Sequence, residues 1–179
     1  PLFPPGDCPT TKVMDDNQSE GPSSHPIQTV LVTGASRGIG LEFVKQWLAR
    51  GADVIATARE PSSATELSSL IDRYGDRLRA MQLDVTDDRS VELLAGALGN
   101  TAVDLLINNA GVLTVETLDN MDIGAILAQF QTNALGALRV THAVLDNLRE
   151  GSRIVNMTSR MGSLDDNTSG GYYGYRMSK

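Results

Sequence analysis

The chain has 179 residues, of which 41% are hydrophobic and 21% charged, and its formal net charge is −7. This length suffices for one domain with a sizeable core, and the composition is that of an ordinary globular protein. The negative charge disfavours nucleic acids and anionic membranes as partners, because both require a basic face. No apolar run approaches the roughly 18 residues of a membrane-spanning helix, so we expect none.

Residues 1–26 are rich in Pro, Gly, Ser, Asp and Asn and show no apolar periodicity. They predict a disordered tail, followed by a single domain over residues 27–179. The tail contains Cys8, the only cysteine, and His25, and we expect neither to bind a metal or to act as a nucleophile. A single cysteine permits no internal disulfide, and no signal peptide is apparent. We therefore expect a cytoplasmic protein without a metal site.

Beyond the tail, short apolar runs alternate with amphipathic stretches. The apolar runs predict strands over residues 29–33, 53–58, 78–83, 103–107 and 153–157. The amphipathic stretches predict helices over residues 39–50, 65–74, 87–98 and 121–147, the last with a bend near residues 133–136. This alternation predicts an α/β fold with a doubly wound parallel sheet of the Rossmann type. Such sheets usually have a sixth strand, so we expect the domain to be incomplete at its C-terminal end.

The first predicted strand runs into a glycine-rich turn, TGASRGIG at residues 33–40, where a helix begins. Missing side chains let the backbone approach a pyrophosphate, and the helix N-terminus offers free N–H groups and a positive dipole end. The turn therefore predicts dinucleotide binding, although a plain turn between strand and helix is the alternative. The residues expected to contact the cofactor here are Gly34, Ser36, Arg37, Gly38, Ile39 and Gly40.

The end of the second predicted strand indicates which dinucleotide is preferred. An NAD enzyme tends to carry an acidic residue there, to bind the ribose 2′-hydroxyl. Here the strand is followed by Arg59, and Glu60 comes one position too late. Arg37 and Arg59 can instead hold a 2′-phosphate by charge-assisted hydrogen bonds, unless both are solvated surface arginines. The sequence favours NADP over NAD.

The third predicted strand is followed by Asp84 and Val85. Asp84 can accept a hydrogen bond from the adenine amino group while Val85 lies against the ring. The alternative is that this segment only caps the next helix, and the two are compatible because Thr86 or Asp87 can supply the cap.

Two further motifs follow strands at the same sheet edge. The fourth strand is followed by NNAG at residues 108–111, and the fifth by Ser159. Small residues at the first motif would let a cofactor lie across the sheet edge, where ligands of α/β folds bind, although on its own the motif could be a turn that ends the strand. Thr158 and Ser163 are alternatives to Ser159 for an active-site hydroxyl. The residues expected along the cofactor are Asn109, Ala110 and Gly111.

Near the C-terminal end, Tyr175 and Lys179 form a YxxxK pattern. On a helix this spacing puts both side chains on one face, where the ammonium favours the phenolate and so suits the tyrosine to acid–base catalysis. Tyr172 and Tyr173 are close by, but only Tyr175 has a lysine four residues later. His142 lies within the long predicted helix, and we expect it to have a packing or surface role.

These motifs occur together and in order: TGxxxGxG, NNAG, Asn133 within QTNALG, Ser159 and YxxxK. In this combination residues 29–179 resemble the short-chain dehydrogenase/reductase family, in its single-domain branch. Residues 161–173 resemble the C-factor-like and carbonyl-reductase-like subgroup.

The resemblance implies a role for each catalytic residue. Tyr175 would donate a proton to a substrate carbonyl oxygen as a hydride arrives from the nicotinamide. Lys179 would favour the phenolate and bind the nicotinamide ribose, and both side chains would lie against the cofactor. Ser159 would hold the carbonyl oxygen, and Asn133 would anchor a water that leads to Lys179.

The expected activity is NADPH-dependent reduction of a small-molecule aldehyde or ketone, and the sequence does not indicate which. The alternative is a catalytically inactive dinucleotide-binding or signalling protein with the same fold. By resemblance, the full-length protein would be a homo-oligomer.

Overall fold

The computed structural model describes residues 26–179, so the predicted tail lies outside the described residues except for Pro26. One parallel sheet has the strand order β3-β2-β1-β4-β5. Its strands are β1 Thr29–Val32, β2 Asp53–Ala58, β3 Leu78–Gln82, β4 Val103–Asn108 and β5 Leu148–Asn156. The order reverses between β1 and β4, which confirms the predicted doubly wound sheet.

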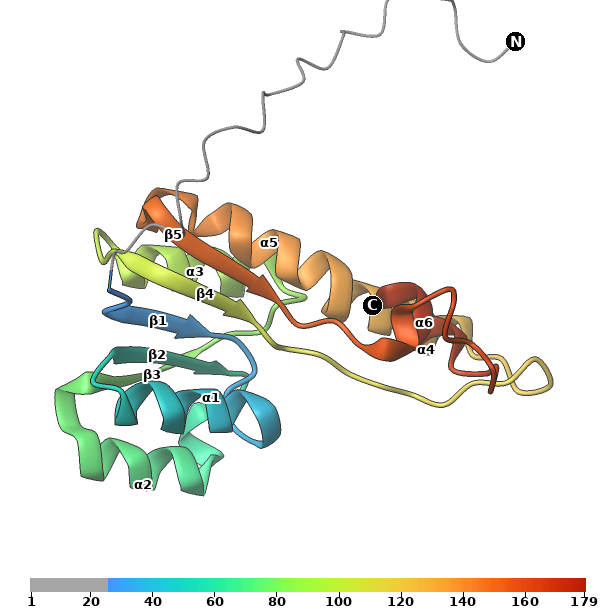
Figure 1. Ribbon diagram of the computed structural model, residues 1–179, viewed down its shortest axis with the longest axis horizontal. Coiled ribbons are helices and arrows are strands. Elements are labelled where there is room, and N and C mark those ends of the chain that lie inside the picture. The colour runs from blue at the N-terminus through green and yellow to red at the C-terminus, as the bar shows by residue number, and fades with distance from the viewer. Residues whose placement is uncertain (1–25) are drawn as a thin grey trace, which may run out of the picture.

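Helices cover both faces of this sheet (Figure 1). They are α1 Gly38–Ala49, α2 Thr65–Tyr74, α3 Asp88–Leu98, α4 Ile123–Phe130, α5 Gly136–Ala143 and α6 Tyr173–Ser178. A π-helical turn, η3 Gln131–Leu135, joins α4 to α5. Short 3-10 turns are η1 Pro61–Ser63, η2 Gly75–Arg77, η4 Leu145–Asn147 and η5 Arg160–Gly162. Within residues 26–179, no helix is both long enough and apolar enough to cross a membrane.

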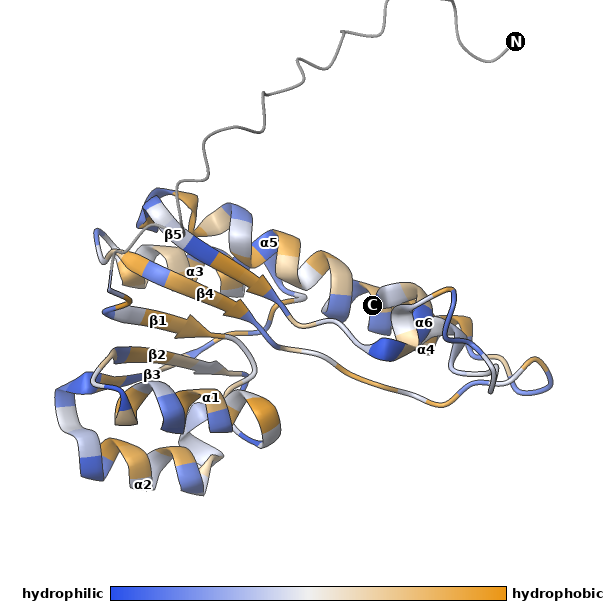
Figure 2. Ribbon diagram, in the orientation of Figure 1, coloured by the Kyte–Doolittle hydropathy of each residue, from blue (hydrophilic) through white to orange (hydrophobic). Residues whose placement is uncertain are grey.

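Successive residues of the central strands face two separate hydrophobic cores. Val30 and Val32 of β1 pack with the buried faces of α1 and α2, whereas Leu31 packs with α3 and α5. Side chains alternate along a strand, so a strand with helices on both sides must be apolar throughout. Figure 2 shows this as orange colour along β1 and β4.

The predicted helix over residues 121–147 is the main correction to the sequence analysis. The structure divides it into α4, the π turn, α5 and the 3-10 turn η4. The predicted bend is confirmed and is the π turn. At the far end, Asn147 donates hydrogen bonds of 2.8 Å to the carbonyl oxygens of Gly99 and Thr101. These bonds hold the last residues against the end of α3, so the helix stops at Ala143.

The fifth strand is longer than predicted, because it begins at Leu148 and not at residue 153. Its pairing with β4 shifts register between Val103 and Leu105, which lets the strand pass Gly151 at a φ of +88°. At this register shift the Ser152 hydroxyl donates a hydrogen bond of 2.8 Å to the Val103 carbonyl. Gly151 and Ser152 interrupt the apolar run from which the strand was predicted, so the prediction placed the start of the strand too late. The other elements agree with the prediction to within one residue at each end.

Candidate active site

A cleft of about 620 Å³ lies at the carboxyl ends of β1, β2, β3 and β4. Every residue predicted to bind the cofactor lines it, except Tyr175 and Lys179. Those residues come from four separate loops, so the parallel sheet is what brings them together. The remaining lining residues, which the sequence analysis did not name as site residues, are Ala58, Leu83, Thr86, Val112, Ala128, Gln131 and Thr132.

The glycine turn forms one wall of the cleft, at the N-terminus of α1. Gly34 has a φ of +66°, and a Cβ there would lie 2.8 Å from the Ala110 Cα. Gly38 also has a positive φ, of +57°, but open space surrounds the position of its missing Cβ. Gly34 therefore lets two loops meet, whereas Gly38 leaves an open cradle.

The N-terminus of α1 has no side-chain cap, whereas those of α3 and α4 do. Asp87 accepts a hydrogen bond from the Arg89 N–H at 2.9 Å, and Asp122 accepts one from the Ala125 N–H at 3.0 Å. At α1 the N-cap residue is Arg37, which makes no such bond. The first N–H groups of α1 thus remain available to an anion, as pyrophosphate binding requires.

Asn109 holds the glycine turn in place. Its side-chain amide donates to the carbonyl oxygens of Thr33 at 2.9 Å and Gly34 at 3.1 Å. In return, the Thr33 hydroxyl accepts hydrogen bonds of 3.0 Å from the N–H groups of Asn109 and Ala110. Asn109 therefore shapes the cleft through the backbone. Thr33 shares this task and was not among the predicted site residues.

Asp84 lies beside Arg59 at one side of the cleft. Its Oδ1 accepts hydrogen bonds from the Thr86 N–H at 2.9 Å and from the Thr86 hydroxyl at 2.7 Å. Burial raises the pKa of Asp84, but the bonds from Thr86 and the charge of Arg59 outweigh burial, so the pKa lies below its ordinary value. The carboxylate is therefore ionised and fixed. Asp87, and not Thr86, caps the next helix.

The two predicted phosphate-binding arginines, Arg37 and Arg59, both line the cleft. No salt bridge within residues 26–179 engages either guanidinium group. Glu60 is not among the lining residues and serves as the N-cap residue of η1.

Asn133 sits in the π turn and is 8% exposed. Its Oδ1 accepts from the Val112 N–H at 2.8 Å, and its Nδ2 donates to the Val112 carbonyl at 2.8 Å. The same amide nitrogen donates to the Ser178 hydroxyl at 2.9 Å. Asn133 thus joins the loop after β4 to α6.

Tyr175 and Lys179 lie close together, as their spacing predicted. The Lys179 ammonium nitrogen is 5.9 Å from the centre of the Tyr175 ring and donates to the Met157 carbonyl at 2.8 Å. Burial lowers the pKa of Lys179 below its usual value. A Cβ on Gly111 would lie 3.2 Å from Asn133 Oδ1 and 3.4 Å from Lys179 Nζ. Asn133 and Lys179 therefore lie next to Gly111, which also lines the cleft.

The three candidate hydroxyl groups differ in their hydrogen bonds. Ser159 accepts from the Met161 N–H at 3.2 Å, and Ser163 accepts from the Asp166 N–H at 3.3 Å. Thr158 instead donates to the Lys179 carbonyl at 2.8 Å. Ser159 directly precedes η5, which packs against α6.

The sequence analysis missed a buried polar pair, Glu116 and Gln129. The pair contacts Gly174, the residue that precedes Tyr175. Glu116 is 2% exposed and Gln129 is fully buried. A glutamine between Ile126 and Phe130 in an apolar helix is the one signal that could have indicated it. Within residues 26–179, no His, Cys, Asp and Glu side chains cluster in a way that could hold a metal ion.

Comparison with known proteins gives a consistent family. The family model described as short chain dehydrogenase matches residues 28–179. The chain is 39% identical over 155 residues to 1-hydroxy-2-glutathionyl-2-methyl-3-butene dehydrogenase of Rhodococcus sp. strain AD45, which covers 86% of this chain and 66% of that protein. It is 54% identical over 80 residues to C-signal of Myxococcus xanthus, which covers 43% of this chain and 48% of that protein. The chain thus spans less than two thirds of the length of either relative.

Solved structures agree with this family. NADPH-bound carbonyl reductase from chicken fatty liver superposes with a TM-score of 0.79 at 34% identity, covering 86% of this chain and 69% of that one. A carbonyl reductase from Pseudomonas aeruginosa PAO1 in complex with NADP gives a TM-score of 0.80 at 35% identity, covering 86% and 70%. C-signal and the carbonyl reductases bear out the resemblance seen in the sequence.

Proposed function

Because the chain belongs to the short-chain dehydrogenase family, we propose that it reduces an aldehyde or ketone to the alcohol, with NADPH as the reductant. One observation carries this proposal. Lys179 and Asn133 lie beside Gly111, at a cleft lined by the predicted dinucleotide-binding residues, and the Lys179 ammonium nitrogen is 5.9 Å from the centre of the Tyr175 ring. The arrangement combines a proton donor with a place for a reductant.

The cleft fits a dinucleotide with a 2′-phosphate. The uncapped N-terminus of α1 and the open cradle at Gly38 would hold the pyrophosphate. Arg37 and Arg59 would bind the 2′-phosphate, and Asp84 the adenine. The related carbonyl reductases from chicken and P. aeruginosa are described with NADPH and NADP, which supports this choice over NAD. When bound, NADPH supplies the hydride for the carbonyl carbon.

Tyr175 is the proposed general acid, donating its phenolic proton to the substrate carbonyl oxygen. The nearby ammonium of Lys179 stabilises the phenolate that remains. Ser159 donates a hydrogen bond to the same carbonyl oxygen. The Ser159 oxygen accepts a hydrogen bond from the Met161 N–H, so the Ser159 hydroxyl can still donate its proton. The Thr158 hydroxyl already donates its proton to the Lys179 carbonyl.

Asn133 has a supporting role in this proposal. Both ends of its side-chain amide are bonded, to Val112 and to Ser178. We therefore expect Asn133 to hold these two segments in place. Its Oδ1 has a single donor and so keeps a second lone pair, which a water that leads to Lys179 can use.

The decisive test is turnover of NADPH with a panel of aldehydes and ketones by the parent protein and by Tyr175→Phe. We expect Tyr175→Phe to lower kcat by about 10²-fold or more, because it removes the proton donor. NADPH binding should persist, since the phenol hydroxyl is not part of the cleft lining. Tyr173→Phe is the matched control and should keep its activity. NADPH binding without turnover in the parent protein would instead support an inactive binding protein.

A further inference from the structure

Glu116 is the only buried carboxylate within residues 26–179, and no step of the proposed reaction uses it. We infer that Glu116, together with Gln129 of α4, is a positioning residue that sets the placement of α6 and hence of Tyr175. The inference rests on the proposed function, because it concerns how Tyr175 is held.

Glu116 contacts α6 through both its side chain and its backbone. Its Oε2 accepts a hydrogen bond from the Gly174 N–H at 3.4 Å. Its backbone carbonyl accepts from the Tyr172 N–H at 3.1 Å. Tyr172 is the N-cap residue of α6, and Gly174 is its second residue and directly precedes Tyr175. The free N–H groups of a helix start are thereby satisfied by a residue from the loop after β4.

The other oxygen of Glu116 faces α4 and its own loop. Oε1 accepts from the Gln129 amide and from the Thr114 hydroxyl, the latter at 3.1 Å. The Gln129 Oε1 in turn accepts from the Thr114 N–H at 3.0 Å. Both Glu116 oxygens therefore have donors, which a buried carboxylate requires. The pair connects three segments: the loop after β4, α4 and α6.

The fit against α6 is close, and Figure 1 shows α4 and α6 lying side by side. A Cβ on Gly174 would lie 2.5 Å from the Gln129 amide nitrogen, 2.8 Å from Glu116 Oε1 and 3.0 Å from the Ile126 Cα. Only a glycine lets the helix approach the pair so closely. A shift of either side chain would therefore move the backbone of Tyr175.

Besides Glu116, the guanidinium of Arg176 helps to fix the start of the helix, because it donates to the carbonyl oxygens of Gly171 at 3.0 Å and Met161 at 3.1 Å. The helix comprises only Tyr173–Ser178 and has no side-chain cap, and its N-cap residue Tyr172 has a φ of +54°. A helix this short is marginal without tertiary contacts. The polar pair supplies such contacts at the end nearest the catalytic tyrosine, whereas Asn133 supplies one at Ser178.

The charge pattern of the pair gives a specific test. In E116Q, a single amide oxygen must serve the Gln129 amide, the Thr114 hydroxyl and the Gly174 N–H, so at least one donor loses its acceptor. In Q129E, two carboxylates face each other in a buried site. The double variant E116Q/Q129E restores the match. The carboxylate at position 129 accepts from the Thr114 N–H and from the new amide, whose oxygen accepts from Gly174.

The experiment measures kcat, the KM for NADPH and hydrogen exchange over residues 172–178. We expect E116Q to lower kcat about tenfold to 10²-fold, as a displacement approaching 1 Å of a catalytic group can do. The KM for NADPH should not change, and the amides of Tyr172 and Gly174 should exchange faster. The double variant should recover much of the loss, because it restores the match of donors and acceptors. If E116Q does not fold, T114V replaces it, since it removes only one hydrogen bond to Glu116.

Asn147→Ala is the matched control. Asn147 is a buried polar residue with two hydrogen bonds to backbone carbonyls, but it lies at the end of α3 and not at α6. This variant should lower the unfolding midpoint and leave kcat unchanged.

The outcomes separate the inference from the proposed function. Equal kcat in the parent protein and E116Q, or no recovery in the double variant, would overturn the inference alone. If the parent protein shows no turnover, the proposed function fails. Hydrogen exchange then decides the inference, and unchanged exchange at Tyr172 and Gly174 in E116Q would overturn it.

Discussion

Several polar side chains at the edge of the cleft are bonded to backbone groups and not directed at a ligand. Asn109 and Thr33 hold the glycine turn, and Asn133 holds the Val112 peptide. Because backbone groups are the partners, a substitution here changes the shape of the cleft as well as its chemistry. The lining residues that can contact a ligand by side chain include Ser36, the two arginines and Asp84.

Arg59 provides a test of cofactor choice. Arg59→Leu should raise the KM for NADPH about tenfold or more relative to that for NADH, because a hydrogen bond to a charged group contributes ~1.5–3 kcal/mol. Arg89, an exposed arginine at the start of α3 and outside the cleft lining, is the control. Steady-state kinetics with both cofactors would check this. An equal effect on NADPH and NADH would count against a 2′-phosphate contact.

Asp84 predicts a pH dependence of stability. Its pKa in the folded protein lies below the ordinary 3.8, so in acid the folded protein binds fewer protons at this group than the unfolded chain does. The stabilisation is complete above that ordinary value and is lost as the pH falls through the lower, folded value. Asp84→Asn should therefore lower the free energy of unfolding at pH 7 and flatten its decline below about pH 4.

Urea unfolding at pH values spaced by about one unit between pH 2 and pH 7 would give the free energy of unfolding at each pH. Asp72→Asn, at an exposed position on α2, is the control. A parallel acid decline in the parent protein and Asp84→Asn would contradict the assignment.

The residues predicted to contact a cofactor line the cleft together for a physical reason. Each of those residues follows a strand within a few positions, and the parallel sheet brings all strand ends to one edge. Glu116 and Gln129 could not be predicted in this way. Their contacts with each other and with Gly174 join segments far apart in the chain, and no local pattern records such a pairing.

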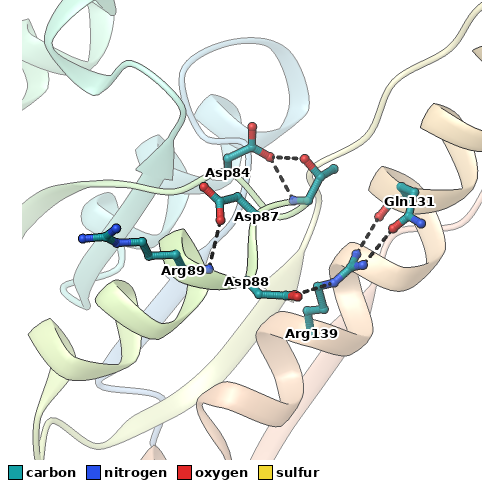
Figure 3. Close-up of polar contacts among 7 residues, drawn as sticks. Asp84, Asp87, Asp88, Arg89, Gln131 and Arg139 are labelled. Atoms are coloured by element: carbon teal, nitrogen blue, oxygen red, sulfur yellow. Dashed lines mark hydrogen bonds and ion pairs between the residues drawn. The ribbon is translucent and has the colours of Figure 1, made fainter.

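At the scale of elements, the π turn determines where Asn133 lies. An extra residue in a helical turn leaves backbone groups without their regular partners. Arg139 of α5 supplies one partner, since its guanidinium donates to the Gln131 carbonyl at 3.4 Å and to the Gln131 side chain at 2.8 Å. It also pairs with Asp88 of α3 at 2.9 Å, as Figure 3 shows. Arg139 thus fixes the π turn against α3.

Arg139→Met should lower the free energy of unfolding by about 1–2 kcal/mol, from the two bonds to Gln131 and a largely exposed ion pair. It should also weaken NADPH binding, because Gln131 lines the cleft. Lys45→Met, which removes the exposed pair between α1 and α2, is the matched control and should change stability by less than about 1 kcal/mol. Chemical denaturation and a binding titration would check both effects. Equal effects of the two substitutions would refute a special role for Arg139.

The predicted helix over residues 121–147 shows the limit of periodicity as evidence. A π turn disturbs the apolar pattern by one residue, which suffices to indicate a bend but not its geometry. The cap at Asp122 could be recognised from sequence, whereas the end at Ala143 depends on Asn147 reaching α3. Local caps are therefore readable in advance, and ends set by long-range contacts are not.

At the scale of the whole molecule, two of the exposed apolar regions within residues 26–179 are groups of residues on a single strand or helix. One is β5 at the sheet edge, where Ile154 is 42% and Val155 39% exposed. Neighbouring residues of a strand face opposite sides, so neither face of β5 is fully covered. The other is α4, whose exposed residues Ile123, Leu127 and Phe130 recur at helical spacing. Contiguous apolar surface of this kind marks an interaction site.

If the protein forms the homo-oligomer that the family resemblance implies, we expect the apolar stripe of α4 to contribute to contacts between copies. Leu127 is 58% exposed in the middle of the apolar stripe, so Leu127→Glu would place a charge in such a contact. The variant should elute as a smaller species than the parent protein in size-exclusion chromatography with light scattering. Leu93→Glu is the control, because Leu93 of α3 is 66% exposed but lies outside the stripe. A parent protein that stays monomeric at high concentration would rule out this role for α4.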